Sequence, residues 1–477
     1  MVARIVFIGA LCLLAFLWGG LSTTFKFFPY RLFVKTKLAY DALTQIASDE
    51  FLDRKPTKFE ELESEGLTGP TVRRAERRAG TADELILVNG GYYQMMSECP
   101  RFGCLAWIMD RTGRVRHVWE VDPKQVWGDV KRLAGFKQAD NIYPVGMHLY
   151  PDGDLLVTFQ ARNTYPYAVG IARFDRNSVL RWKVENLAHH WLSVGEDGLI
   201  YVPSLNPVDS PMAVGTTRAM VVCKAEKVYE DLIRVYTDDG RLVETISVTK
   251  ALLESGYPGL IFEGNESDPP EYVECDPTHL NDVRVLSKEL ADEYPELNPG
   301  DILISMRNNN TLAVIDRATR RVKKVITGKT LLQHSPIFVG QGRIIVLDNL
   351  GGPQAKGGSR VARLDLGNGA VETLFPRAAT PDDVDFYTHN GGRLVLHPSG
   401  RRALVGLTRR GRVLEVDLER GDVLWEYVNT HDLAPYLGTK DREGKRRFAR
   451  FSATEAYYVI SPSFPMNRER NREKPSL

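Results

Sequence analysis

The sequence predicts an all-β fold, a six-bladed β-propeller preceded by an N-terminal transmembrane or signal helix and a short helical linker. Three observations predict it: a long apolar run at the amino end, short β-rich runs from about residue 84 onward, and Gly, Asp and Asn turns that divide these runs into six similar units. The predicted domains are a membrane anchor or signal segment (1–22), a helical and basic linker (23–80), the propeller (81–460) and a polar tail (461–477).

The composition excludes several classes of protein. The 477 residues include 62 Lys and Arg against 61 Asp and Glu, and the resulting net charge of +1 supplies no bulk field that would recruit nucleic acid. The five cysteines form no CxxC pair, so a zinc ribbon or a thioredoxin-type redox centre fits poorly. The sequence therefore predicts neither a cofactor nor a nucleic-acid partner.

The first element is the apolar run Ile5–Leu21, 17 residues interrupted only by glycines. It is long for a signal-peptide core and just long enough to span a bilayer, so an uncleaved anchor is favoured, while cleavage after Ser22 stays open. Three basic residues between positions 31 and 37 follow the run and only Arg4 precedes it. The positive-inside rule alone would therefore keep the body in the cytoplasm.

The linker is predicted to begin as a helix, because apolar residues recur at three- and four-residue intervals from Arg31 to Leu67. Four arginines then fall between positions 73 and 78. This basic stretch is predicted to be a solvated connection, with contact to anionic lipid as the minor alternative.

The propeller is predicted from a repeated sequence pattern: a strand, a turn with Gly, a second strand, a polar break, a third strand ending in Asp, a turn and a last strand. Insertions near 206–230 and 250–275 make its period irregular. The first unit supplies Cys104–Asp110 and Val115–Trp119, and the other five begin near His148, His190, His279, His334 and Arg393. A strand-like piece, Ala456–Ile460, is predicted to pair into the first blade and close the ring, which removes exposed sheet edges.

Histidine placement points to a site. The sequence contains no P-loop, dinucleotide, GxSxG or HExxH motif. Only nine histidines occur, yet His148, His190, His279 and His334 all stand where the first strand of a blade is predicted to begin. That strand lines the central channel, so equivalent positions of successive blades converge on the axis. A single such histidine is most often a solvated lining; four in register indicate a site.

A donor-rich pocket is predicted around His279. Asn281 lies two residues after it, and Arg307 follows the same blade's second strand with three asparagines behind it. Guanidinium and amide donors beside several imidazoles suit a small tetrahedral anion. Thr408 ends the second strand of the last blade much as Arg307 ends its own, so it is predicted to line the channel.

Residues 85 to 430 resemble the bacterial aryl sulfotransferase family, nucleotide-independent enzymes with six-bladed propellers that work outside the cytoplasm. The resemblance lies in an ordered set of motifs: His189-His190 before a turn, His279-Leu-Asn281, Ser305-Met-Arg307, and Gln333-His334 before the strand that leads to Asn349. It implies that a histidine takes a sulfuryl group from an aryl sulfate ester, forms a sulfohistidine and passes the group to an acceptor phenol.

Carried over position by position, the resemblance makes His334 the histidine that becomes sulfated. His279, Asn281 and Arg307 match the sulfate-binding and acid/base residues, and His190 or its neighbour His189 matches the histidine of the preceding blade. Either His279 or His190 is expected to protonate the departing phenolate. The expected substrate-binding residues are His148, His189, Thr408 and Asn349, and no metal ligand is assigned.

The expected partners are a small aryl sulfate donor and a phenolic or other hydroxyl acceptor, and the family tendency is a homodimer. Cys99 and Cys104 lie close together, while Cys223 and Cys275 fall in the two insertions; either pair would form a disulfide in an oxidising compartment. With the resemblance, the cysteines outweigh the charge bias. They predict a body on the periplasmic or outer side of a bacterial membrane, held there by the N-terminal helix.

Two other functions stay open. One is a metal-dependent hydrolase or oxidoreductase with the histidines as ligands, although the channel candidates are mostly cationic or neutral and such a site favours carboxylates or a tighter histidine set. The other is a non-catalytic propeller that binds a partner through its top face, in which the histidines are incidental.

Overall fold

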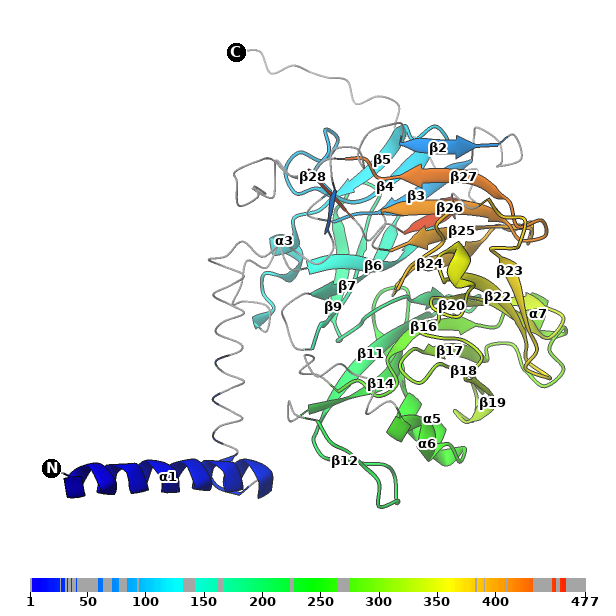
Figure 1. Ribbon diagram of the computed structural model, residues 1–477. Helices are drawn as coiled ribbons and strands as arrows, with labels where there is room; N and C mark the ends of the chain where they lie inside the picture. Colours follow the sequence, from blue (N-terminus) through cyan, green and yellow to red (C-terminus); the bar gives the residue numbers. More distant parts are fainter. Residues whose placement is uncertain are drawn as a thin grey trace, which may run out of the picture. The chain divides into compact units, whose positions relative to one another are not determined.

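The computed structural model describes the chain except for residues 1, 26, 31, 33–35, 37–39, 41–58, 63–70, 77–83, 92–93, 132–141, 162–165, 224–226, 264–274, 382–383, 390, 409–410, 432–447, 452–454 and 460–477 (Figure 1). It divides into two compact units, Met1–Thr57 and Lys58–Leu477. Each unit is described by itself.

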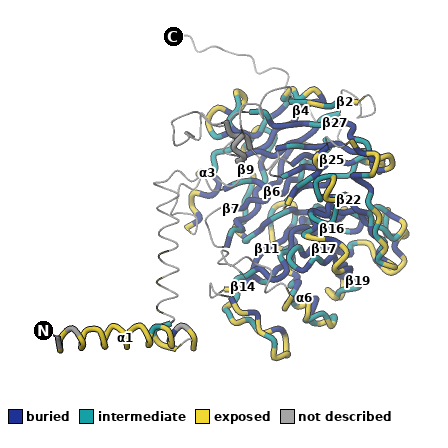
Figure 2. Tube along the Cα trace, in the orientation of Figure 1, coloured by how far each residue is buried: buried dark blue, intermediate teal, exposed yellow. Residues whose placement is uncertain are grey.

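The first unit contains one long helix, α1 (Val2–Phe25), where the sequence predicts an anchor or signal helix. Most of its described side chains are exposed, including the large apolar groups Phe7, Leu14 and Phe16 (Figure 2). Among the helices described, none meets the length and apolarity needed to cross a membrane. The helix is thus confirmed, and the membrane anchor stays a prediction.

The predicted linker differs from expectation in two places, while most of the helix expected between Arg31 and Leu67 lies outside the described residues. Within that range, β1 (Phe59–Leu62) is a strand paired antiparallel with β28 (Phe448–Phe451). The basic stretch begins with another strand, β2 (Val72–Ala75), which adds a fifth strand to the last blade by pairing with β27 (Val423–Val428). In both places a distant strand supplies backbone hydrogen-bond partners, which local periodicity cannot reveal.

Six antiparallel sheets form the six blades, as the sequence predicts. From the inner strand outward, the first three are β29 (Ala456–Val459), β3 (Leu85–Asn89), β4 (Cys104–Asp110), β5 (Val115–Glu120); β6 (Ile142–Leu149), β7 (Leu155–Ala161), β8 (Ala168–Phe174), β9 (Leu180–Glu185); and β10 (Ser193–Val194), β11 (Ile200–Asp209), β14 (Lys227–Tyr236), β15 (Leu242–Ser247). The last three are β16 (Leu280–Val285), β17 (Ile302–Met306), β18 (Thr311–Ile315), β19 (Val322–Thr327); β20 (His334–Gly340), β21 (Arg343–Asp348), β22 (Arg360–Asp365), β23 (Val371–Phe375); and β24 (Arg393–Leu396), β25 (Arg402–Leu407), β26 (Arg412–Asp417), β27 (Val423–Val428).

The aspartate that ends the third strand of most blades has a local structural role. In blade 2 the Asp175 carboxylate accepts hydrogen bonds from the backbone N–H groups of Asn177 and Val179, at 2.8 and 2.9 Å. Asp110, Asp316, Asp365 and Asp417 make the same kind of contact in blades 1, 4, 5 and 6. Such turns reverse the chain into the outer strand, which explains why a strand ending in Asp and followed by a turn recurs in the sequence.

The core lies between the blades. The middle strands β4, β7, β17 and β18 are buried along their whole length, because each blade packs against a neighbour on both faces (Figure 2). This explains their continuous apolar sequence, whereas an outer strand such as β9 has no fully buried residue.

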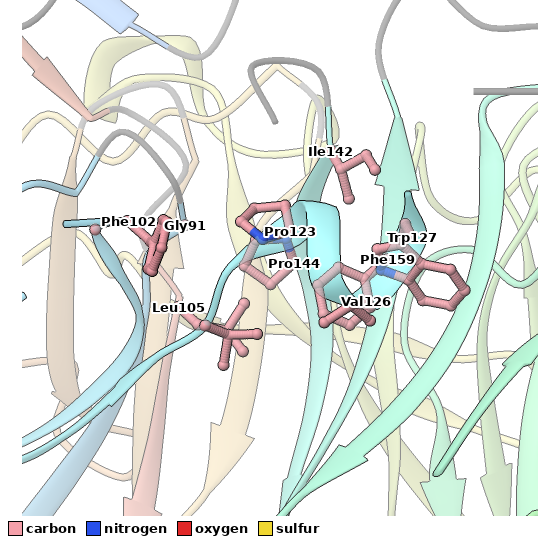
Figure 3. A pocket seen from close by; sticks show the side chains of 11 residues that line it. Gly91, Phe102, Leu105, Pro123, Val126, Trp127, Ile142, Pro144 and Phe159 are labelled. Atoms are coloured by element: carbon pink, nitrogen blue, oxygen red, sulfur yellow. The ribbon is translucent and has the colours of Figure 1, made fainter. Parts of the chain in front are cut away.

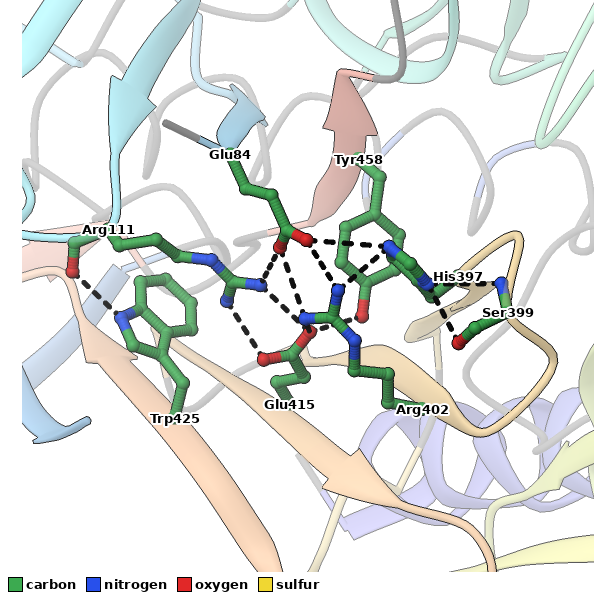
Figure 4. Close-up of polar contacts among 8 residues, drawn as sticks. All are labelled: Glu84, Arg111, His397, Ser399, Arg402, Glu415, Trp425 and Tyr458. Carbon is green, nitrogen blue, oxygen red and sulfur yellow. Dashed lines mark hydrogen bonds and ion pairs between the residues drawn. The ribbon is translucent and has the colours of Figure 1, made fainter. Parts of the chain in front are cut away.

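The ring closes where the sequence predicts. β29 pairs with β3 from Ala456 opposite Val88 to Val459 opposite Leu85. A buried ionic network lies beside this joint and links blades 1 and 6 (Figure 4). Its centre is Glu415, which has no exposed surface and accepts hydrogen bonds from Arg111 and Arg402 at 2.9 Å and from Tyr458 of β29 at 2.6 Å.

We expect Glu415→Gln to lower the free energy of unfolding by about 3–5 kcal/mol, because it leaves Glu84 as the remaining carboxylate beside the guanidinium groups of the buried Arg111 and the partly buried Arg402. Urea denaturation followed by tryptophan fluorescence measures the change. Glu419→Gln removes the partner of Arg401 from an exposed ion pair and should cost less than about 1 kcal/mol. Equal losses in the two variants would contradict a stabilising role for the network.

The first insertion lies within blade 3, and the second connects blade 3 to blade 4. β11 and β14 continue beyond the blade and carry the hairpin β12 (Met212–Ala213) and β13 (Met220–Val221), and the second insertion contains α5 (Val248–Glu254) and α6 (Pro258–Glu263). A disulfide between Cys223 and Cys275 joins the two insertions, and a second links Cys99 to Cys104. Both predicted cysteine pairs are confirmed. Three further short helices, α3 (Pro123–Trp127), α7 (Lys288–Ala291) and the 3-10 helix η4 (Gln354–Lys356), lie in connections between strands of the described chain.

Candidate active site

Four histidines from three successive blades meet at the start of the inner strands. His190 precedes β10 and His279 precedes β16, and their ring centroids lie 4.8 Å apart. Both residues have a left-handed backbone, with φ of 54° and 50°. This conformation is strained for residues other than glycine and is often retained where it positions a functional side chain. In blade 5 the left-handed residue is Ser335, so His334 lies one residue earlier in the same turn.

The imidazole of His334 has a defined tautomer. Its Nδ1 lies 2.7 Å from Oδ1 of Asn349, and the Asn349 amide nitrogen donates to the carbonyl oxygens of Thr388 and Gly391 at 2.9 and 2.8 Å. These carbonyls fix which end of the amide is the donor, so Oδ1 must accept the Nδ1–H of His334. The lone pair of the ring is therefore on Nε2.

Buried surroundings keep His334 neutral. The residue is 1% exposed, and the Trp191 ring packs against its imidazole at nearly a right angle, with centroids 5.4 Å apart. Burial and then the positive charge of Arg307 lower the pKa of His334 to about 3, although the hydrogen bond to Asn349 opposes the shift. The imidazole is thus a neutral base with a free lone pair at ordinary pH.

Trp191 packs against the imidazole of His334, and we call its indole ring the floor of the site. Its indole N–H donates to the buried Glu455 carboxylate at 2.8 Å, and the guanidinium of Arg393 lies 5.6 Å from its ring centroid. Glu455 is held against blade 1, because its backbone N–H donates a hydrogen bond to Oδ1 of Asn89, the last residue of β3, at 2.8 Å. The segment that closes the ring therefore also supports the floor of the site.

Arg307 and Asn281 lie beside the histidines as predicted, with different contacts. The Arg307 backbone N–H donates to the His279 carbonyl at 3.1 Å, and its guanidinium donates to Asn308 Oδ1 at 2.9 Å. The Asn281 amide donates to the Gln333 carbonyl at 2.9 Å, directly before His334, while its fully buried Oδ1 has no hydrogen-bond partner among the described residues. Arg307 supplies positive charge; Asn281 supports the strand that carries His334.

His279 and His190 have different partners. His279 Nδ1 contacts the Asp276 carboxylate at 2.6 Å, and Tyr167 donates to the same carboxylate oxygen at 3.1 Å. Burial alone would raise the pKa of Asp276, but the charge and hydrogen bond of His279 hold it below its ordinary value. The Asp276 carboxylate is therefore ionised beside His279.

His190 Nδ1 instead contacts His189 Nδ1 at 2.7 Å and the Gln160 amide at 3.3 Å. Burial and then the charge of His279 place the pKa of His190 well below its ordinary value, and burial lowers that of His189 to about 3. His189 Nε2 lies 3.6 Å from Asp231, whose pKa is raised well above its ordinary value by burial and then by the charge of Asp276.

The structure does not bring His148 to this cluster. It pairs with Leu156 near the opposite end of the inner strand, its ring packs against Tyr150 at 4.6 Å, and its lowered pKa of about 4 arises from burial and then the charge of Arg173. Gly146, two residues earlier, is the blade 2 residue that meets the backbone of His190. The sequence register was wrong here because β6 contains an irregularity between Pro144 and Met147 that no turn residue announces.

Thr408 lies close to the site. Thr388 donates to the Thr408 carbonyl at 3.0 Å and accepts from Asn349 through its own carbonyl, while the buried Thr408 hydroxyl has no partner among the described residues. Sequence reasoning missed Asp276, Tyr167, Trp191, Gln160 and Asp231. Asp276 lies three residues before His279 and Trp191 directly follows His190, so both could have been found from the sequence. Tyr167, Gln160 and Asp231 come from separate strands or turns.

An apolar pocket between blades 1 and 2 is separate from the histidines (Figure 3). Leu105, Val126, Trp127, Ile142 and Phe159 are among its lining residues. Within the described part of the chain, no group of three or more His, Cys, Asp or Glu residues is arranged to hold a metal ion.

Comparison with known proteins gives one specific match. The family model described as Arylsulfotransferase (ASST) matches residues 146–430, more than half of the chain and all of the histidine cluster. No curated protein matches.

Among solved structures, a protein of unknown function from Bacteroides caccae is similar at 10% identity and a TM-score of 0.43, covering 80% of this chain and 100% of its own. The periplasmic gluconolactonase of Pseudomonas aeruginosa is similar at 13% identity and a TM-score of 0.39, covering 80% of this chain and 100% of its own. The hydrazine synthase of Kuenenia stuttgartiensis is similar at 13% identity and a TM-score of 0.36, covering 66% of this chain and 71% of its own. At these scores they carry no argument about this chain.

Proposed function

The chain belongs to the arylsulfotransferase family, and on this premise we propose that it transfers a sulfuryl group from an aryl sulfate ester to an acceptor hydroxyl through a sulfohistidine at His334. The observation that supports this best is the contact between His334 and Asn349. It directs the lone pair of Nε2 away from the amide and leaves it available for attack.

The partner of His334 also suits a transient intermediate. Asn349 is a neutral amide whose oxygen accepts a hydrogen bond from Nδ1–H but is too weak a base to remove the proton. The ring therefore keeps the Nδ1 proton after Nε2 has been sulfated. The sulfated ring is then a cation, and a neutral imidazole is a better leaving group than an imidazolate anion. Attack and departure are thus both served by one fixed tautomer.

Charge stabilisation comes from Arg307. A sulfuryl group in transfer spreads negative charge over three equatorial oxygens, as a phosphoryl group does, and fixed positive donors are the main source of catalysis. The positive charge of Arg307 contributes to lowering the pKa of both His334 and His190, which supports a position close to the transferring group.

The proposed reaction has two steps. First, Nε2 of His334 attacks sulfur, the S–O bond to the aryl group breaks, and the aryl oxygen leaves with the electron pair and takes a proton from a histidine of the cluster. Then an acceptor hydroxyl attacks sulfur, gives its proton to that histidine, and the electron pair of the N–S bond returns to Nε2. Neither step requires an oxidant, a reductant or a nucleotide.

Brief mixing of the protein with p-nitrophenyl sulfate tests the proposal. Intact mass should rise by about 80 Da, peptide mapping should place the group on His334, and one equivalent of p-nitrophenol should appear in a burst. Addition of phenol should remove the adduct and yield phenyl sulfate. Release of nitrophenol with inorganic sulfate as the sole product and no adduct would contradict transfer through a covalent intermediate.

The burst should persist in mild acid. An ordinary imidazole is roughly 97% protonated at pH 5, but His334 with a pKa of about 3 stays unprotonated there. We expect the burst rate to fall by less than about 3-fold between pH 7.5 and pH 5 in stopped-flow measurements. A fall of 10-fold or more would show that the nucleophile is an imidazole with an unperturbed pKa.

We also propose that the body works on the outer side of a bacterial membrane. Two disulfides, Cys99–Cys104 and Cys223–Cys275, support an oxidising compartment. Immunodetection of the protein in periplasmic and membrane fractions tests the placement, and recovery in the cytoplasm with four free thiols would contradict it.

A further inference from the structure

The two histidines that sequence analysis leaves as alternatives for proton transfer are not equivalent in the structure. His279 Nδ1 lies 2.6 Å from Oδ2 of Asp276, and the other carboxylate oxygen accepts the His279 backbone N–H at 3.1 Å. Asp276 therefore binds His279 at both the ring and the backbone. The ring nitrogen bound to the carboxylate carries a proton, so Nε2 is the nitrogen that exchanges protons.

The surroundings of the pair hold it in one geometry. Tyr167 donates to Asp276 Oδ2 at 3.1 Å, and the amide of Asn308 donates to the Asp276 carbonyl at 2.7 Å. The same Asn308 accepts from the guanidinium of Arg307 at 2.9 Å. The carboxylate that orients His279 and the charge beside His334 are thereby connected through one side chain.

His190 lacks such a partner. Its Nδ1 contacts another imidazole and an amide, and no carboxylate is in contact with it among the described residues. An imidazolium at this position would lie next to His279 and near Arg307, and among the described residues no carboxylate contacts it to offset its charge. A proton donor must carry its proton before the leaving group departs, and His190 is disfavoured in that form.

We propose that Asp276 is a positioning residue that makes His279, rather than His190, the group that protonates the departing aryl oxygen and takes the proton of the acceptor; this role rests on the sulfuryl transfer proposed above. In the first step the Nε2–H of a His279 imidazolium goes to the aryl oxygen as the S–O bond breaks. In the second step the acceptor O–H returns a proton to Nε2 as its oxygen bonds to sulfur. Asp276 keeps its charge throughout and offsets that of the imidazolium.

Two aryl sulfates that differ in leaving group distinguish this role from a structural one. p-Nitrophenolate is a weak base that departs with little help, whereas phenolate, with a conjugate-acid pKa near 10, needs a proton. We expect Asp276→Asn to slow burst formation about 100-fold with phenyl sulfate and less than about 10-fold with p-nitrophenyl sulfate. Tyr167→Phe, which removes one contact to the same carboxylate, should show the same preference with smaller losses.

Asp231→Asn is the matched control. Asp231 is also fully buried, and its Oδ1 lies 3.6 Å from the His189 ring, whereas the His279 ring is bound to Asp276. Its Oδ2 accepts hydrogen bonds from the Thr278 hydroxyl at 2.5 Å and the Leu280 backbone N–H at 2.8 Å, and the oxygen of an asparagine amide can keep both contacts. Burial and then the charge of Asp276 raise the pKa of Asp231 well above its ordinary value, so the neutral amide replaces a carboxyl group that favours its neutral form. Its losses should be the same for the two donors. Thermal denaturation checks that each variant folds, and if Asp276→Asn does not, the leaving-group preference of Tyr167→Phe decides.

The outcomes separate the role from the function. Equal losses with both donors in Asp276→Asn and Tyr167→Phe would overturn the role of Asp276 while the wild type still forms its adduct. If only Asp231→Asn lost more activity with phenyl sulfate than with p-nitrophenyl sulfate, proton transfer would be assigned to His190, whose neighbour His189 lies beside Asp231. A wild-type protein that forms no adduct with either donor would overturn the proposed function and this role with it.

Discussion

His334→Ala is expected to abolish formation of the 80 Da adduct and to lower turnover of p-nitrophenyl sulfate by at least about 10⁴-fold, since removal of a covalent nucleophile from other enzymes costs up to about 10⁶-fold. The physical reason is that no other imidazole of the cluster has the same combination of contacts. His334 alone donates Nδ1–H to a neutral, fixed amide, whereas His279 is bound to a carboxylate and His190 to a second imidazole.

His148→Ala is the control for this experiment. It makes the same substitution on an inner strand, but His148 lies among Tyr150, Arg173 and Asp238 instead of the cluster. Turnover should stay within about 2-fold of the wild type. Adduct formation by His334→Ala, or loss of turnover in His148→Ala comparable to that in His334→Ala, would contradict the assignment of the nucleophile.

Arg307→Gln is expected to lower the rate of both half-reactions by about 10³-fold, as found for other groups that stabilise a transferring oxyanion. It should also move the pH dependence. The charge of Arg307 is, after burial, the main cause that lowers the pKa of His334, so its removal raises that pKa toward the ordinary 6.5. Protonation then removes the nucleophile at a higher pH, and the burst should decline in acid where the wild type does not.

Arg307→Lys separates the two contributions. Lysine keeps the positive charge but not the planar set of donors, so it should retain the flat pH profile of the wild type and recover only part of the rate. Arg317→Gln serves as a control on the same blade, because Arg317 pairs with Glu244 at the hairpin after β18. A variant Arg307→Gln with an unchanged pH profile would contradict the electrostatic link to His334.

The fold could be predicted from sequence because its determinants are local. In most blades the third strand ends at an aspartate that binds the turn behind it, and fully buried middle strands leave continuous apolar runs. The strands β1 and β2 could not be predicted, since Phe59–Leu62 and Val72–Ala75 pair with strands near the other end of the chain.

The site was predictable only where function needs a rare residue type at a repeated position. His190, His279 and His334 met that condition, and Arg307 and Asn349 each directly follow the second strand of a blade, in a way that motifs can capture. Tyr167 and Gln160 could not be found by spacing alone, because they reach the Asp276–His279 pair and His190 from blade 2. The contact of Trp191 with His334 could not be found either, because it joins two blades that lie far apart in the sequence. The tautomer of His334 required the two carbonyls that fix the amide of Asn349.

Ring closure by β29 has a consequence for biosynthesis. In order of translation, Ala456–Val459 follows every other blade strand, so a nascent chain holds an open edge on β3 until this segment emerges. The residue just before it, Glu455, binds the indole of Trp191 beneath His334. A chain halted by premature termination ahead of Glu455 would contain all four clustered histidines and still lack the support of their floor, so catalytic competence is acquired only with the last strand of the ring.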